Sequence, residues 1–164
     1  MKVGIVGLGY VGLPLAVAFC DAGHEVWGVD ADKRTVDELS SGRSHIEDVS
    51  DERLAAIAER FHPSTRYADL AKVDAAIIAV PTPLTRNREP DLGPLVSAGT
   101  SLAGVLRAGQ LVVLESTTYP GTTRERLVPL LEESGMAAGR DFNVAFSPEP
   151  VSYTHLTLPT TPYV

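Results

Sequence analysis

Residues 1–15, MKVGIVGLGYVGLPL, decide the fold of this chain. They read as a short apolar strand, a glycine-rich turn and the start of a helix, with Gly7, Gly9 and Gly12 at G-x-G-x-x-G spacing. In a βαβ unit the first glycine permits a tight turn, the second lets the backbone approach a pyrophosphate, and the third lets helix and strand pack closely. The helix N-terminus then offers N–H groups and a positive dipole end to phosphates. The stretch therefore predicts a dinucleotide site. The alternative is a turn of the same shape that binds nothing.

An acidic residue follows the second apolar run at the distance expected for ribose recognition. Asp30 comes directly after Val26–Val29. A carboxylate there accepts a hydrogen bond from the adenosine ribose 2′-hydroxyl and repels a 2′-phosphate, so Asp30 favours NAD over NADP. Its alternative role is that of a plain turn or capping residue. Tyr10 and Val11 lie inside the glycine loop and are assigned to the cofactor with it. Arg34 lies either near the adenosine or on a solvated helix face.

Composition limits the classes of protein and partner. The chain has 164 residues, 44% hydrophobic and 21% charged, which is typical of a soluble globular domain. A net charge of −7 without a Lys/Arg cluster disfavours nucleic acid and anionic membranes as partners. We expect no signal peptide, membrane span or metal site. Cys20 is the single cysteine, which fits a reducing cytoplasm, and its apolar surroundings indicate a buried residue rather than a nucleophile.

Strand and helix patterns alternate along residues 1–149. Ala75–Val80 and Leu111–Leu114 are almost entirely apolar, as in strands buried on both faces of a parallel sheet. The fold class is therefore α/β, a Rossmann-type doubly wound and mostly parallel six-stranded sheet. We predict strands near 2–6, 25–29, 65–67, 74–80, 110–114 and 143–146, and helices near 11–22, 32–41, 51–61, 92–107 and 121–134.

Three polar segments follow predicted strand ends. They are Pro81–Pro83, Glu115–Gly121 and Ser147–Glu149. Ligands bind beyond the carboxyl ends of the strands in such sheets, so we expect the three segments to meet at the edge that carries the glycine turn. Their hydroxyls and carboxylates suit proton transfer beside a nicotinamide. Each segment alone could equally be an ordinary turn.

Residues 1–149 resemble the N-terminal domain of the UDP-sugar 6-dehydrogenases, a family of nucleotide-sugar dehydrogenases. The resemblance is carried by GLGYVGLPLA at 7–16, Asp30, VPTP at 80–83, ESTTYPGTT at 115–123 and FSPE at 146–149. It implies NAD as cofactor and the oxidation of C6 of a UDP-hexose to a carboxylate, with two NAD⁺ used in succession. It also implies that the parent protein is a homo-oligomer.

The resemblance also assigns individual residues. Thr117 matches a threonine that helps to orient the catalytic water, and Glu149 matches a glutamate of acid–base or thioester-hydrolysis function. Thr82 matches a residue of the cofactor loop. The segment Thr82–Leu92 and the form ESTTYPGTT look more like enzymes acting on UDP-N-acetylhexosamines than on UDP-glucose. The implied product is a uronate precursor of surface polysaccharide.

The family pattern contains parts that this sequence does not hold. The family's nucleophilic cysteine, and its lysine and asparagine from a central region, cannot be placed here, because Cys20 is in the wrong element. We expect the family's central dimerisation domain and C-terminal UDP-binding domain to be absent from this chain. We therefore expect this chain to bind NAD without dehydrogenase activity. Two other hypotheses are a stand-alone NAD-binding regulatory module and a dehydrogenase of 2- or 3-hydroxy acids, which would share the first βαβ unit but not ESTTYPGTT or FSPE.

Residues 150–164 differ in composition from the rest of the chain. They contain no Asp, Glu, Lys or Arg, and Pro150 stands where the family usually has arginine. The segment VSYTHLTLPT at 151–160 resembles the conceptual translation of a transposon-type sequencing adapter. We interpret 150–164 as a non-native tail, and 1–149 as an NAD-binding Rossmann domain. The alternative is a flexible polar terminus.

Overall fold

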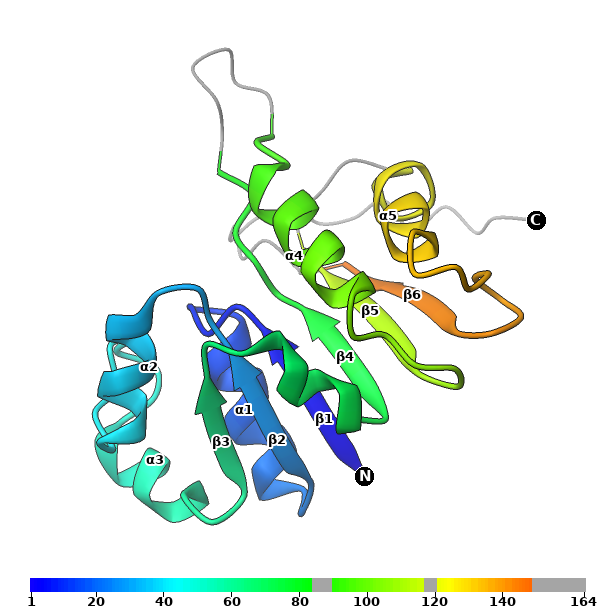
Figure 1. Cartoon of the computed structure of the whole chain (residues 1–164). Helices are drawn as coiled ribbons and strands as arrows, with labels where there is room; N and C mark the ends of the chain where they lie inside the picture. Colours follow the sequence, from blue (N-terminus) through cyan, green and yellow to red (C-terminus); the bar gives the residue numbers. More distant parts are fainter. Residues whose placement is uncertain (84–89, 117–120, 149–164) are drawn as a thin grey trace, which may run out of the picture.

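A computed structural model describes residues 1–83, 90–116 and 121–148. Its six strands form one parallel sheet in the order β3-β2-β1-β4-β5-β6 (Figure 1). The strands are β1 (Lys2–Val6), β2 (Glu25–Val29), β3 (Phe61–Ser64), β4 (Ala75–Ile78), β5 (Leu111–Glu115) and β6 (Asn143–Ser147). The predicted Rossmann-type α/β fold is confirmed, and every pairing among these strands is parallel.

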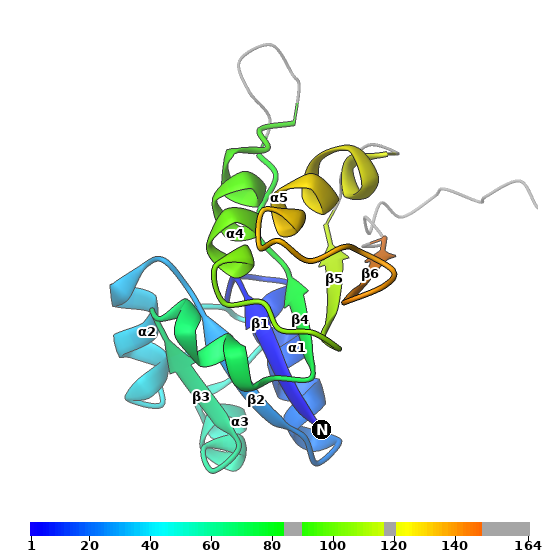
Figure 2. The ribbon, with the colours of Figure 1, turned by 45° about the vertical axis from the view of Figure 1, so that its right-hand side comes forward.

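Helices cover both faces of the sheet (Figures 1 and 2). One hydrophobic cluster joins α1 and α3 to β1 and β2, and a second joins η1, α4 and α5 to β4 and β5. The helical segments are α1 (Gly12–Asp21), α2 (Lys33–Ser40), α3 (Asp51–Ile57), the 3₁₀ segment η1 (Tyr67–Lys72), α4 (Gly93–Ala103), the π-type segment η2 (Thr123–Leu127) and α5 (Val128–Glu132).

The central strands are buried because helices lie on both sides of them. All four residues of β4 are buried, and so are four of the five in β1. The continuous apolar runs in the sequence therefore reflect burial on two faces, as predicted. Parallel order also places the carboxyl ends of all six strands at one edge, where the glycine turn begins.

The third strand was predicted in the wrong place. It occupies Phe61–Ser64 rather than 65–67, because α3 ends at Ile57 instead of continuing to residue 61. Pro63 has no N–H to donate, but β3 is an edge strand of the described sheet and pairs with β2 alone. A proline is tolerated there, since one side of an edge strand needs no donor. The following η1 was not predicted from the sequence.

The helix predicted over 121–134 is interrupted. Thr123–Leu127 has π-type geometry, and regular α-helix covers Val128–Glu132. Pro129 lacks an N–H, so the α-helical hydrogen bond from residue 129 to Glu125 cannot form. The other predicted helices and strands are present, some of them with shorter ends. Cys20 is buried in α1, as predicted. Within the described ranges, no helix has the length and apolar character needed to cross a bilayer.

Candidate functional site

The glycine turn joins the ends of three neighbouring strands. The Gly7 N–H donates to the carbonyl oxygen of Val29 at the end of β2, with N···O 2.8 Å. The φ angle of Gly7 is +93°, and a Cβ there would lie 2.7 Å from the carbonyl oxygen of Ala79 beyond β4. Only glycine meets both conditions without strain, so Gly7 allows the tight turn that the sequence predicts.

Gly12 and Gly9 are glycines for different reasons. A Cβ on Gly12 would overlap the carbonyl oxygen of Gly7 and lie 2.9 Å from its carbonyl carbon. Gly12 therefore lets α1 start against the turn. A Cβ on Gly9 would have no described atom within 4 Å. The protein itself does not require a glycine at position 9, and the open space above it fits a ligand that approaches the backbone.

Asp30 is bonded to the glycine loop. Its Oδ2 accepts the Leu8 N–H at 2.8 Å, and its Oδ1 accepts the Asp32 N–H at 2.9 Å. Each carboxylate oxygen has two lone pairs, so acceptor capacity remains for a ribose hydroxyl. Asp30 thus has a turn-forming function, as the alternative interpretation proposed, and this does not conflict with ribose recognition. Asp32, rather than Asp30, caps α2 by accepting the Arg34 N–H.

A cleft of about 430 Å³ opens beside the loop. Two of the three predicted segments meet there with the glycine turn, which confirms that part of the expectation. Among the candidate residues, Gly9, Tyr10, Val11 and Thr82 line the cleft. Of these residues, Tyr10 is 72% exposed. Among the described residues, no side chain caps the N-terminus of α1, and uncapped N–H groups at a helix start are donors of the kind that bind phosphate.

Two polar residues of the cleft were not singled out from the sequence. Glu115 ends β5, and Ser116 follows it with only 4% of its surface exposed. The Ser116 hydroxyl lies 3.5 Å from that of Thr82, so the two strand ends meet through their side chains. The sequence identified the segment that contains them, because polar residues after a buried strand indicate the ligand-binding edge of the sheet. Which of them faces the cleft depends on the three-dimensional path of the chain.

The remaining candidates lie elsewhere or are not described. Arg34 is exposed on the first turn of α2, four positions after Asp30. Ser147 pairs with Glu115 in the sheet, but Ser147 and Pro148 are not among the described residues that line the cleft. Thr117 and Glu149 lie outside the described residues, and so does the tail at 150–164. Their assigned roles stay predictions.

Cys20 lies in the core. It is 2% exposed within the cluster of α1 and α3 and is not one of the described cleft residues. Burial, together with the negative charge of Asp21, raises the pKa of its thiol to about 11, although Arg60 opposes the shift. The thiolate is therefore disfavoured at neutral pH. The described ranges bring together no group of three His, Cys, Asp or Glu side chains that could hold a metal ion.

A family model described as the NAD-binding domain of UDP-glucose/GDP-mannose dehydrogenases matches residues 1–156. The chain belongs to this family. It is 41% identical over 153 residues to the UDP-N-acetyl-D-glucosamine 6-dehydrogenase of Pseudomonas aeruginosa, covering 93% of this chain and 36% of that protein.

Two solved structures are also similar. The GDP-mannose dehydrogenase of Pseudomonas aeruginosa superposes with a TM-score of 0.86 at 34% identity, over 91% of this chain and 36% of that one. The UDP-D-ManNAc dehydrogenase of Pyrococcus horikoshii superposes with a TM-score of 0.85 at 39% identity, over 92% of this chain and 37% of that one.

Family membership identifies the cofactor of this domain as NAD. The geometry fits it, because the turn, the open space over Gly9 and the acceptor capacity of Asp30 are what a dinucleotide requires. The chain spans little more than a third of the length of the UDP-glucose/GDP-mannose dehydrogenase relatives it matches.

Proposed function

We propose that this chain is the NAD-binding part of a UDP-sugar 6-dehydrogenase, which oxidises C6 of a UDP-hexose to a uronate. The observation that carries the proposal is the cleft, in which the glycine loop meets the ends of β4 and β5. Described residues from three of the motifs that resemble the family, GLGYVGLPLA, VPTP and ESTTYPGTT, line this cleft. The parent enzyme would also hold a central dimerisation domain and a C-terminal UDP-binding domain, assembled as a homo-oligomer.

Residues of this chain would bind and orient the cofactor. The loop backbone from Gly7 to Gly12 would hold the pyrophosphate, and Asp30 the adenosine ribose. Thr82 and Ser116 lie at the cleft and would contact the remainder of the dinucleotide. When bound, NAD⁺ supplies the hydride acceptor for the oxidation.

The substrate-facing chemistry is proposed from the resemblance. Thr117 would orient the attacking water, and Glu149 would move protons during oxidation or thioester hydrolysis. The substrate class is a UDP-N-acetylhexosamine, because relatives at 39–41% identity are named for UDP-N-acetyl-D-glucosamine and UDP-N-acetyl-D-mannosamine. The uronate product would form in the cytoplasm and would be a precursor of surface polysaccharide.

Residues 1–149 form the native domain in this proposal, and residues 150–164 are a non-native tail. The family match extends to residue 156 and so overlaps the first part of that segment. Sequencing the source DNA beyond codon 149 distinguishes a non-native tail from a tail that the genome encodes. An arginine codon followed later by an in-frame cysteine motif supports a longer enzyme. A genomic tail ending in a stop codon supports the stand-alone NAD-binding module instead.

The purified 164-residue chain provides the biochemical test. We expect calorimetric binding of NAD, weaker binding of NADP, and no formation of NADH with UDP-N-acetylglucosamine or UDP-glucose. The physical reason for inactivity is that Cys20 is buried, with a raised pKa, outside the described cleft lining. Formation of NADH by the purified chain would contradict the expected lack of dehydrogenase activity. Absence of NAD binding would contradict the cofactor site.

A further inference from the structure

A chain of hydrogen bonds links Asp30 to the end of β3. The Asp30 N–H donates to the carbonyl oxygen of Ser64, with N···O 3.1 Å, while the Asp30 carboxylate accepts the Leu8 N–H. The main chain of Asp30 is therefore fixed by β3, and its side chain by the glycine loop. Any displacement of Ser64 moves the residue that we assign to the ribose.

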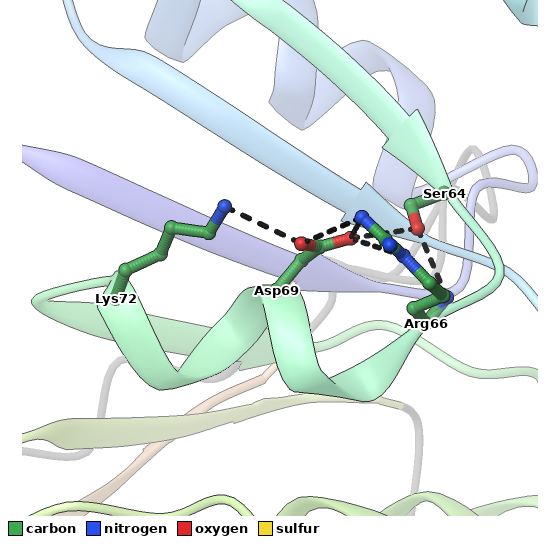
Figure 3. A network of polar contacts seen from close by, with 4 residues as sticks. All are labelled: Ser64, Arg66, Asp69 and Lys72. Atoms are coloured by element: carbon green, nitrogen blue, oxygen red, sulfur yellow. Dashed lines mark hydrogen bonds and ion pairs between the residues drawn. The ribbon is translucent and has the colours of Figure 1, made fainter.

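Ser64 is in turn held by Asp69 of η1 (Figure 3). The Ser64 hydroxyl donates to Asp69 Oδ2 at 2.8 Å and accepts the Arg66 N–H at 3.0 Å. A hydroxyl has a single proton to donate, so this one is committed to Asp69. Because β3 is an edge strand of the described sheet, no described strand supports Ser64 from its outer side.

The Asp69 carboxylate is enclosed between two exposed cations. Its side chain is 12% exposed, and it lies 3.1 Å from Arg66 Nη2 and 3.3 Å from Lys72 Nζ. Burial raises the pKa of Asp69, but hydrogen bonds from Ser64, Lys72 and Arg66 outweigh that effect and leave the pKa below its usual value. The group is thus a carboxylate at neutral pH and a strong acceptor for Ser64.

Asp30 also interacts electrostatically with η1. Tyr67, the first residue of η1, is half-buried, and both its burial and the negative charge of Asp30 raise the pKa of its phenol. The Asp30 carboxylate and the network of Ser64 and Asp69 lie close together, because the Asp30 N–H donates to Ser64 where β2 and β3 end.

We propose that Asp69 is a positioning residue for NAD, acting through Ser64 to fix Asp30 where its carboxylate meets the adenosine ribose 2′-hydroxyl. The proposal rests on the assignment of Asp30 to that hydroxyl. Asp69 does not contact the cofactor itself, so its effect falls on the contact that Asp30 makes.

The test compares two ligands in calorimetric titrations of the full chain: NAD and its analogue lacking the adenosine 2′-hydroxyl. The wild-type chain is expected to prefer NAD. In Asp69→Ala, affinity for NAD should fall about 2- to 10-fold, the range that one ordinary hydrogen bond supplies, while affinity for the 2′-deoxy analogue changes little. A residue that merely stabilises the fold would leave the ratio of the two affinities unchanged. An unchanged ratio overturns the proposal.

Two further variants keep the test decisive. Ser64→Ala removes the hydroxyl but keeps the carbonyl that Asp30 uses, and it should lower the ratio in the same direction even if Asp69→Ala does not fold. Asp21→Asn is the matched control, because it removes an exposed acid paired with Arg53 in another part of the fold. A ratio unchanged in Ser64→Ala, or lowered equally in Asp21→Asn, overturns the proposal. If wild type binds NAD without preferring the 2′-hydroxyl, the Asp30 assignment and this proposal fail, whereas NAD binding stands.

Discussion

Separate alanine substitutions at Gly12 and Gly9 should distinguish the glycine that the fold requires from the glycine that ligand binding requires. In Gly12→Ala the new methyl group would overlap the Gly7 carbonyl oxygen and lie 3.2 Å from Ile5 Cγ2. The obstacle is backbone, so it cannot be relieved by rotating a side chain. Overpacking of this kind costs about 1–3 kcal/mol or more, and we expect the upper end, about 3 kcal/mol of unfolding free energy.

Gly9→Ala should behave in the opposite way. No described atom lies within 4 Å of the new methyl group, and Gly9 does not have a positive φ. The unfolding free energy should therefore stay within about 0.5 kcal/mol of wild type. The methyl group would occupy space that we assign to the pyrophosphate. We expect NAD affinity to fall at least about tenfold, equivalent to about 1.4 kcal/mol.

Urea denaturation without NAD measures the first quantity, and calorimetric titration with NAD measures the second. Trp27 is the single tryptophan, and its fluorescence reports unfolding. Two results would refute the reasoning. One is a Gly12→Ala variant that unfolds at the wild-type urea concentration. The other is a Gly9→Ala variant that binds NAD as tightly as wild type, because the open space would then not be the pyrophosphate site.

Three more predictions follow from the same geometry. Asp30→Ala removes the acceptor of two backbone N–H groups, so the unfolding free energy, measured by urea denaturation, should fall by about 1–3 kcal/mol, and NAD affinity, measured by calorimetry, should fall with it. A wild-type unfolding free energy would contradict the stabilising role of the two hydrogen bonds, and a wild-type NAD affinity would contradict the assignment of Asp30 to the cofactor. Cys20 should react with a thiol reagent only as the chain unfolds, because it is 2% exposed and its pKa is raised to about 11; rapid modification of the native chain at pH 8 would show that α1 opens readily. The folded-state pKa of Asp69 is lowered, so its contribution to stability is present above the unfolded-state pKa of about 4 and is lost as pH falls through the folded value. The difference in urea midpoint between wild type and Asp69→Asn should thus shrink below pH 4, and a constant difference would argue against it.

The sequence predicts those parts of the fold that depend on local patterns. The apolar runs at β1, β4 and β5, the glycine spacing and the acid after β2 all have a fixed local signature, and each is found where expected. The edge strand was misplaced because α3 ends at Ile57 rather than near residue 61, and only sheet order shows that β3, which contains Pro63, lies at an edge. The π-type turn before Pro129 depends on a missing donor within an otherwise helical pattern.

The site was predictable to the level of segments. Polar residues after buried strands indicated the ligand edge, but Glu115 and Ser116 were not distinguished from their neighbours. Their position in the cleft depends on contacts between distant strands, such as the approach of Thr82 to Ser116. The connection from Asp69 to Asp30 is likewise not visible in the sequence. It depends on η1, whose short helix carries no pattern that would have revealed it.

The hydrogen bond between Asp30 and the Leu8 N–H has a consequence for how this domain can evolve. A change of cofactor preference toward NADP would call for loss of the Asp30 charge, yet the same carboxylate supports the glycine loop. A substitution that accommodates a 2′-phosphate would therefore also weaken the turn that we assign to the pyrophosphate. Asparagine at position 30, together with a cation nearby, would keep only one of the two backbone hydrogen bonds that Asp30 accepts and would so reduce that conflict. The route between the two cofactors thus requires a compensated pair of substitutions rather than a single step.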